Sequence, residues 1–523
     1  MLRQAPDGGK IKASGSCLNW NDLLSTQRMR PSHGHKNHYD GRNAFEKDYH
    51  RIILSASFRR LQDKTQVFPL DQSDFVRTRL THSLEVSSLA KSLGEQTSEL
   101  LRQRGIEGAP NPDQQKELSD LLLCAGLIHD LGNPPFGHYG ETTIRNWYKT
   151  HLRSLEFRGK PLWTWLKPQM QADLENFEGN AQALRLVSKL HFMVDEHGMN
   201  LTSALLNTLI KYPVNSLAID ANTEDVRYHK MGYFYQERDL FETICNATGT
   251  MLVEERPEAY IAENTGEDAG QMSFGPDNGL RRSCRHPLTY LLEAADDISY
   301  RTADLEDASR KGKITFGQLQ DSLEHSERLA DIGDEKLLEQ YRAVVRELSH
   351  RLSIAREKKI QNPELYAIQN WIIFVQTQLI QSVIESYAEH YPKIMRGQYN
   401  YDLFHENFAG LLLDVLGDIA YDYVFSSQAI VQLEVASDAI IGGLLDKFVP
   451  ACINFDTELE QKPVDKRLMD LVSDNYRANY YREAAGRDEG YRLYLRLLLV
   501  NDYICGMTDS FAKNLYYKFN GIY

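Results

Sequence analysis

The chain has 523 residues with 42% hydrophobic and 25% charged residues, values typical of folded globular proteins that exclude a largely disordered chain. A formal net charge of −14 excludes a surface coated with phosphate-binding cations, so any contact with nucleic acid has to be local. Six scattered cysteines form no CxxC pair, and no apolar run suits a signal peptide or a membrane span. We therefore expect a cytoplasmic protein with no membrane partner.

The hydrophobic pattern indicates helices along most of the chain, and strand-like alternation is almost absent, so the expected fold class is all-α. Residues 1–45 are polar and lack a hydrophobic period, which predicts a loosely ordered arm. A core is expected at 46–315, with a loop or hairpin insertion near 263–279, and an additional helical lobe at 316–523. Helices are expected at 76–101, 118–130, 181–195, 201–211, 287–311, 334–358, 364–390, 409–424, 436–448 and 489–516.

The first candidate site is the doublet His129-Asp130, which ends a nearly all-apolar helix. An isolated doublet of this kind is usually structural, with the histidine bonded to a backbone carbonyl. His82 lies on the preceding helix in phase with Val86, so it should point towards the same interior. Arg79, one turn earlier, adds an inward-facing cation, and the combination fits a site for an anionic ligand.

A further carboxylate comes from the helix expected at 287–311, which contains the adjacent residues Asp296 and Asp297. Helical spacing places Asp296 on an apolar stripe and Asp297 on a charged one, so we expect Asp296 to face inward and Asp297 to lie on a solvated, salt-bridged face. Two imidazoles and two carboxylates would hold one divalent metal ion. Mn or Mg is expected first, and Fe, Ni or Zn are alternatives.

His138 and Glu141 follow the doublet, in or just after a loop rich in proline and glycine. A histidine three residues before a carboxylate can be oriented by it and can act as a general acid or base. A helix N-terminal capping arrangement explains the spacing equally well. Closeness to the doublet in the chain favours the catalytic interpretation.

Seven stretches of the chain resemble the bacterial dGTP triphosphohydrolases of the HD superfamily. They are FRRLQDKTQVFPL (58–70), VRTRLTHSLEV (76–86), LIHDLGNPPFGHYGE (127–141), NFEGNAQALRL (176–186), LIKY (209–212), EAADDISYRTADLED (293–307) and DYICGMTD (502–509). The resemblance implies an HD-domain helical bundle whose C-terminal lobe completes a nucleotide pocket and provides oligomer contacts. It also implies hydrolysis of dGTP to deoxyguanosine and inorganic tripolyphosphate, in control of the dNTP pool.

The resemblance also assigns roles to matching positions. The implied metal ligands are His82, His129, Asp130 and Asp296. The implied catalytic pair is His138 and Glu141. The implied substrate contacts are Arg79, Lys211 and Tyr300 on the triphosphate, Gln66 on the sugar with Val67 beside the base, and Phe425 and Glu434 around guanine. A core Phe and a surface Glu explain that last pair equally well.

Other functions stay open at this point. A dNTP triphosphohydrolase of broader specificity, or another HD nucleotide phosphohydrolase, would need the same metal ligands. A nucleotide sensor or a single-stranded-DNA-binding protein would need no acid–base pair, so His138 and Glu141 argue against it. The resemblance further implies a homo-oligomer, commonly a hexamer, and leaves regulation by dNTPs or single-stranded DNA open.

Overall fold

A computed structural model describes residues 12–13, 17–30, 40–66, 76–191, 195–254, 280–330, 332–426 and 428–522. Within these ranges the chain forms twenty α-helices and five strands of two to four residues, which confirms the all-α class. None of the helices there has the length and apolar character that a bilayer span requires.

The α-helices follow one another along the chain with few long connections. They are α1 (Trp20–Leu23), α2 (Ala44–Ile53), α3 (Ala56–Arg60), α4 (Arg79–Gln103), α5 (Pro112–Ile128), α6 (His138–His151), α7 (Pro168–Glu175), α8 (Gly179–Arg185), α9 (Ser203–Leu209), α10 (Arg238–Thr248), α11 (Pro287–Arg310), α12 (Phe316–Glu324), α13 (Glu335–Glu357), α14 (Pro363–Ile394), α15 (Phe408–Ala420), α16 (Gln428–Ile453), α17 (Pro463–Asp470), α18 (Asp474–Ala484), α19 (Glu489–Cys505) and α20 (Asp509–Phe519). The strands are β1 (Lys12–Ala13), β2 (Glu156–Phe157), β3 (Lys160–Pro161), β4 (Met251–Glu254) and β5 (Leu280–Ser283).

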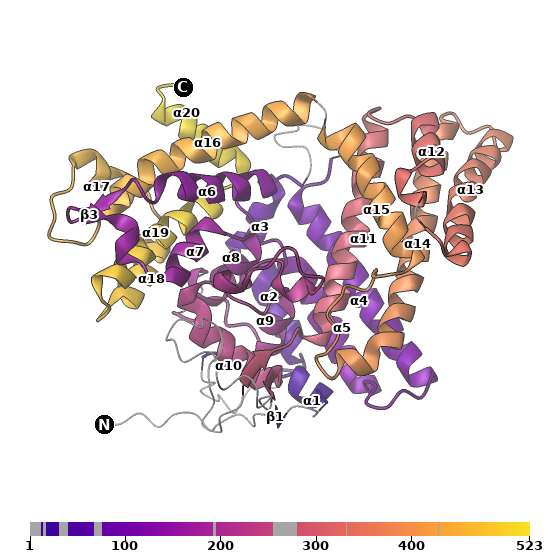
Figure 1. Cartoon of the computed structure of the whole chain (residues 1–523), viewed down its shortest axis with the longest axis horizontal. Coiled ribbons are helices and arrows are strands. Elements are labelled where there is room, and N and C mark those ends of the chain that lie inside the picture. The colour runs from indigo at the N-terminus through magenta and orange to yellow at the C-terminus, as the bar shows by residue number, and fades with distance from the viewer. Residues whose placement is uncertain are drawn as a thin grey trace.

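Helices α4 and α5 form an antiparallel pair at the centre of the molecule, and α11 packs against α4 (Figure 1). Gly126 of α5 permits close approach of the two backbones, because a Cβ atom there would lie 2.4 Å from the Ser87 Cα of α4. This contact brings the first turn of α4 beside the last turn of α5. His82 lies on that first turn, and His129 is the residue that caps the C-terminal end of α5.

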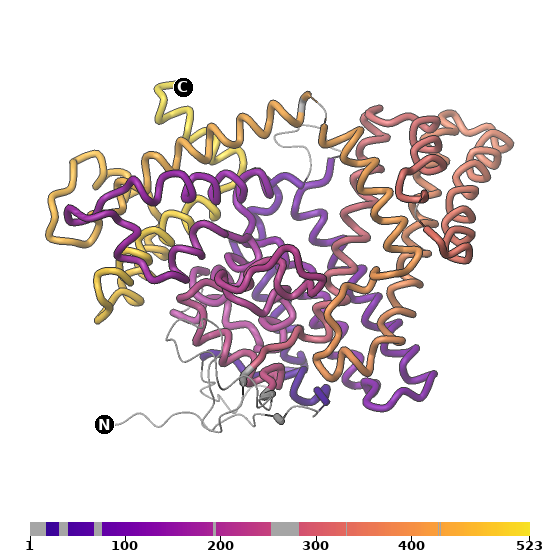
Figure 2. Tube along the Cα trace, in the orientation of Figure 1, coloured from indigo at the N-terminus to yellow at the C-terminus, as the bar shows by residue number. Residues whose placement is uncertain are grey.

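The helices after α11 form two groups at opposite ends of this core. Helices α12–α15 pack against one another, and α14 and α15 of this group pack against α11. Helices α16–α20 cover the side formed by α6 and α7 (Figure 1). The chain trace in Figure 2 shows α16 running back over the core from one group towards the other. The expected C-terminal lobe therefore consists of two separate helical groups.

Several expected helices differ from those observed. The expected helix 489–516 is two helices, since α19 ends at Cys505 and Thr508 caps the start of α20. The expected helix 181–195 is the short α8, followed by a π-helical turn at Leu186–Leu190. No helix was predicted at α1, α2, α3, α6, α7, α10, α12, α17 or α18; apart from α6, each has eleven residues or fewer, and a short helix shows too few turns for its period to stand out.

The N-terminal arm is also more ordered than its composition predicts, over residues 17–30. Leu18, Trp20 and Leu23 are buried in the core, and the Trp20 indole donates a 2.8 Å hydrogen bond to the Tyr391 hydroxyl. Burial of these apolar side chains outweighs the polar average of the segment. The predicted insertion at 263–279 lies outside the described residues, although β4 and β5, which precede and follow it, pair antiparallel.

Candidate metal and catalytic site

Three of the four expected metal ligands lie together where α4, α5 and α11 meet. His82, His129 and Asp296 each offer one ligand atom, and these atoms all lie within 4.8 Å of one another. His82 Nε2 is 3.1 Å and His129 Nε2 is 3.4 Å from Asp296 Oδ1. The group is buried apart from part of Asp296, as the phase of that residue on its helix predicted.

The chemistry of this group fits a cation. His129 Nδ1 lies 2.8 Å from the Gly126 carbonyl oxygen, so Nδ1 carries the proton and Nε2 presents its lone pair to the group. Within the described part of the chain, that Nε2 is buried and has no hydrogen-bond partner. Burial lowers the pKa of His129, but the charges of Asp130 and Asp296 outweigh this effect and raise it. A divalent metal ion would take the place of a proton at Nε2, because it would be attracted by the same negative potential and would bind the lone pair that the lost proton leaves.

The fourth expected ligand, Asp130, lies at the edge of the group. Its Oδ2 is 3.6 Å from His129 Nε2, and the Arg79 guanidinium donates to the same oxygen at 2.5 Å. Its Oδ1 accepts a 2.7 Å hydrogen bond from Asn133 Nδ2. Burial raises the pKa of Asp130, but the charge of Arg79 and then that of His129 lower it well below its usual range. Asp130 is therefore an ionised neighbour of the three-residue group.

The two cations expected to bind phosphate contact the carboxylate of the metal group and that of its neighbour Asp130. Lys211 Nζ donates to Asp296 Oδ2 at 2.8 Å, as Arg79 does to Asp130. The Arg79 side chain also lies against Gly137, where a Cβ atom would come within 2.3 Å of the guanidinium. Arg79 therefore connects the metal group to the start of α6.

His138 and Glu141 form the expected pair on the first turn of α6. His138 Nδ1 is 3.0 Å from Glu141 Oε2, and Glu141 Oε1 accepts a 2.7 Å hydrogen bond from the Gly179 backbone. The His138 side chain is 69% exposed and that of Glu141 only 2%, so the buried carboxylate orients an accessible imidazole. The alternative capping arrangement does not form, because the N-cap residue is Gly137, which has no side chain.

The carboxylate of Glu141 stays ionised although it is buried. Burial alone would raise its pKa, but the hydrogen bond and charge of His138, followed by the charges of Lys230 and Arg145, lower the pKa to about 2. These two cations were not predicted from the sequence, and neither was Glu178, with which both of them form ion pairs at 3.3 Å. Arg145 could have been found by its i+4 spacing from Glu141, and Glu178 lies in the NFEGNAQALRL stretch, whereas no pattern marked Lys230.

The residues expected to contact the substrate differ in how directly they are connected to this cluster. Tyr300 is half-buried, and burial raises the pKa of its hydroxyl. The charge of Arg79 acts in the opposite direction, so Tyr300 lies within electrostatic range of Arg79. Gln66 is half-buried with its Oε1 lacking a hydrogen-bond partner among the described residues, and Val67 lies outside them. Burial and the charge of Glu434 raise the pKa of Tyr139, which places Glu434 beside the residue that follows His138.

Phe425 ends the π-helical turn Tyr421–Phe425 and is half-buried against the hydrophobic core. No contact described for it joins it to the metal group. Its side chain packs against the core, as the alternative interpretation of this residue expects.

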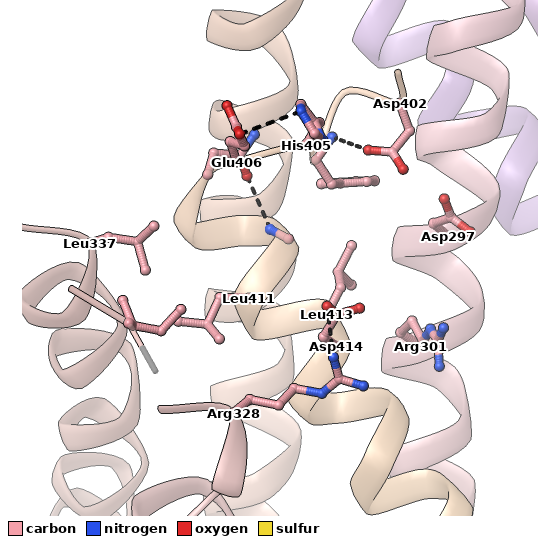
Figure 3. A pocket seen from close by; sticks show the side chains of 14 residues that line it. Asp297, Arg301, Arg328, Leu337, Asp402, His405, Glu406, Leu411, Leu413 and Asp414 are labelled. Carbon is pink, nitrogen blue, oxygen red and sulfur yellow. Dashed lines mark hydrogen bonds and ion pairs between the residues drawn. The ribbon is translucent and has the colours of Figure 1, made fainter. Parts of the chain in front are cut away.

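Asp297 does not lie on a solvated, salt-bridged face, and that prediction is wrong. It is half-buried and lines a cavity of about 560 Å³, together with Arg301 and Arg328 (Figure 3). Among the described residues it has no ion pair, and burial raises its pKa well above the usual range. The segment around Asp402 and helix α15 covers this stripe of α11, which helical phase within one element cannot reveal.

The fold and the metal group define the class of protein. Residues 79–196 match the HD domain family, a segment that contains His82, His129 and Asp130. This domain implies a divalent metal, and the His–His–Asp group supplies a candidate site for it.

Comparison with known proteins narrows the class further. A deoxyguanosinetriphosphate triphosphohydrolase-like protein of Listeria monocytogenes is 42% identical over 97% of this chain and 100% of its own length. A protein of Synechocystis with the same description is 32% identical over 97% of this chain and 100% of its own length. A deoxyguanosinetriphosphate triphosphohydrolase of Yersinia enterocolitica is 29% identical over 96% and 98%. The chain therefore belongs to the deoxyguanosinetriphosphate triphosphohydrolase-like family of HD-domain phosphohydrolases.

Proposed function

We propose that the chain hydrolyses dGTP to deoxyguanosine and inorganic tripolyphosphate. The observation that carries the proposal is one continuous cluster of a His–His–Asp group, two cations on its carboxylate side and the His138–Glu141 pair. Relatives of nearly equal length, named for this activity or for likeness to it, support the choice of substrate.

The residues around the metal group suit a polyphosphate. A metal ion held by His82, His129 and Asp296, with Asp130 beside them, would acidify a bound water and offset phosphate charge. Lys211 and Arg79 add two positive charges at the same place, and a guanidinium suits bidentate binding of phosphate oxygens. The net charge of −14 is therefore compatible with local attraction of a triphosphate.

His138 suits proton transfer at the bond that breaks between the α-phosphorus and the sugar 5′-oxygen. Glu141 holds Nδ1, which leaves Nε2 of an exposed ring to accept a proton from the attacking water or donate one to the leaving 5′-oxygen. Gln66 and Tyr300 would contact the sugar and triphosphate, and Val67 and Phe425 the base. Glu434 would accept from the Watson–Crick edge of guanine.

The test is to incubate the protein with each of the four dNTPs and Mn²⁺ or Mg²⁺ and to separate nucleosides from nucleotides. We expect deoxyguanosine and tripolyphosphate from dGTP. Equal hydrolysis of all four dNTPs would indicate the broader specificity, and dGMP plus pyrophosphate would indicate another HD phosphohydrolase. No turnover, singly or in mixtures of dNTPs, would favour the sensor or DNA-binding alternative.

Assembly and regulation stay predictions from the resemblance. A homo-oligomer, such as a hexamer, is expected, and single-stranded DNA is a possible regulator. Sedimentation with and without an oligonucleotide, alongside the dNTP mixtures, would test both expectations.

A further inference from the structure

The loop between α5 and α6 joins the metal group to the catalytic pair. Asp130 lies at its beginning, and His138 follows its end. Phe136 and Gly137 both have positive φ, at 63° and 60°. A bulky residue rarely adopts this backbone region, so the surroundings must hold the loop in place.

Asp509 holds this loop from the C-terminal side. Its Oδ1 accepts a 2.9 Å hydrogen bond from the Phe136 backbone, while its Oδ2 accepts from the backbone and hydroxyl of Thr65 at 3.0 and 2.5 Å. Only 1% of Asp509 is exposed. One buried carboxylate thus ties the residue two positions before His138 to the residue before Gln66.

Lys64 holds the first half of the same loop, at Asn133. Its Nζ donates to the carbonyl oxygens of Asn133, at 2.5 Å, and Cys505, at 2.7 Å. The Asn133 side chain in turn donates to Asp130 Oδ1. Lys64 is therefore linked to Asp130 through Asn133, and Asp509 is linked to His138 through the backbone of Phe136 and Gly137.

The break between α19 and α20 makes both contacts possible. In a continuous helix the Cys505 carbonyl oxygen would accept from the backbone of residue 509, but here it is free to accept from Lys64. Asp509 is the first residue of α20, so its side chain extends from the helix start towards the loop. Arg185 fixes α19 to the core through two 2.7 Å bonds to Asp502.

Packing alone does not explain these two charged residues. Both are buried, yet no ion pair joins Lys64 to Asp509 among the described residues, and each uses its hydrogen bonds on the loop or on the segment facing it. Buried charges are unfavourable unless such partners are present. Apolar residues of similar size would hold α20 against the core without that penalty.

We propose that Lys64 and Asp509 are positioning residues that clamp the loop at Asn133 and Phe136 and so set the catalytic pair against the metal group. This inference rests on the proposed function for its kinetic consequences. The clamp itself is a property of the loop and can be measured without turnover.

The first test is Asp509→Asn, since an amide has one acceptor oxygen and its NH₂ would face a donor at Phe136 or Thr65. We expect kcat for dGTP to fall at least tenfold while KM and Mn²⁺ affinity change less than twofold. Hydrogen exchange of the peptide 131–138 should become faster. The control is Asp474→Asn at the first position of α18, an exposed site that should leave all three measurements unchanged.

Three further variants separate positioning from folding. Thr65→Val removes one hydrogen bond to Asp509, and Thr65→Ser keeps it, so Ser should restore the kcat that Val lowers. Lys64→Met should instead weaken Mn²⁺ binding about tenfold, because Asn133 no longer holds Asp130. A folded Asp509→Asn protein with wild-type kcat and wild-type exchange at 131–138 would overturn the clamp. Absence of dNTP turnover by the wild type would refute the proposed function, and the exchange and Mn²⁺ measurements would still decide the clamp.

Discussion

The two groups of C-terminal helices attach to the HD core in different ways. Helices α12–α15 bury apolar side chains such as Trp371 and Leu412, and among the described residues their polar bonds to the core go to residues outside the metal group and the His138–Glu141 pair, as in the 2.8 Å bond from Gln376 to the Thr302 hydroxyl. Helices α16–α20 send polar groups into the catalytic side, as in the 2.7 Å bond from the Trp147 indole to Asp446 and the Asp509 contact with the loop. The order of the helices along the chain thus does not determine which of them contact the site. The α16–α20 group contacts the loop that precedes the proposed catalytic pair, and the other group covers the outer face of α11.

The largest expected effect tests the two faces of α11. Asp296→Asn removes a carboxylate from the metal group, so dGTP hydrolysis should fall at least 10⁴-fold, about 5 kcal/mol in activation free energy, with loss of Mn²⁺ binding. Asp297→Asn, one residue away on the cavity side, should change activity less than threefold. Calorimetric Mn²⁺ titration and initial rates measure both. Equal losses in the two variants would contradict the assignment of faces.

The next effect compares the attachment of the two helical groups. Arg185→Met removes the ion-pair partner of buried Asp502 and leaves buried Glu237 with Lys189 at 3.5 Å, which should lower the free energy of unfolding by about 3–5 kcal/mol. Arg328→Met in the other group removes exposed ion pairs with Asp414 and Asp418 and should cost less than about 1 kcal/mol. Urea unfolding measures both changes. Similar midpoints would mean that the buried network does not anchor α19.

His138→Ala tests the role of the exposed imidazole. We expect kcat to fall about 100-fold, roughly 3 kcal/mol, because proton transfer is lost while the metal group is untouched. Mn²⁺ affinity and KM for dGTP should stay near wild type. If metal or nucleotide binding collapses together with kcat, His138 is structural and the proposed role is wrong.

The smallest effect concerns the start of α11, where His286 is the N-cap residue. Burial lowers the pKa of His286 from 6.5 to about 4, so the unfolded chain binds more protons between these values and stability falls as the pH falls through them. From pH 7 to pH 5 this residue should lower the free energy of unfolding by about 2 kcal/mol. Urea unfolding of His286→Asn should show a shallower pH dependence, whereas exposed His350→Asn should keep the wild-type slope.

Much of the fold and part of the site could be predicted from the residues. The period of apolar residues indicated the long helices, and phase within a helix selected Asp296, because both depend only on the 3.6-residue repeat. The same reasoning failed for Asp297, since its environment depends on the segment at Asp402, more than a hundred residues away. It also failed for residues 17–30, whose few apolar side chains are buried by helices far along the chain.

By itself, the sequence determined the helical class, the meeting of His82, His129 and Asp296, and the pairing of His138 with Glu141 over one helical turn. Only the tertiary structure decided that Arg79 and Lys211 contact the carboxylates, and that α19 breaks to place Cys505 and Asp509 at the catalytic loop. The physical reason is the separation along the chain over which each kind of interaction acts. Helical period and i+3 spacing are local properties of the chain, whereas buried charges select their partners among all segments that packing brings within hydrogen-bond distance.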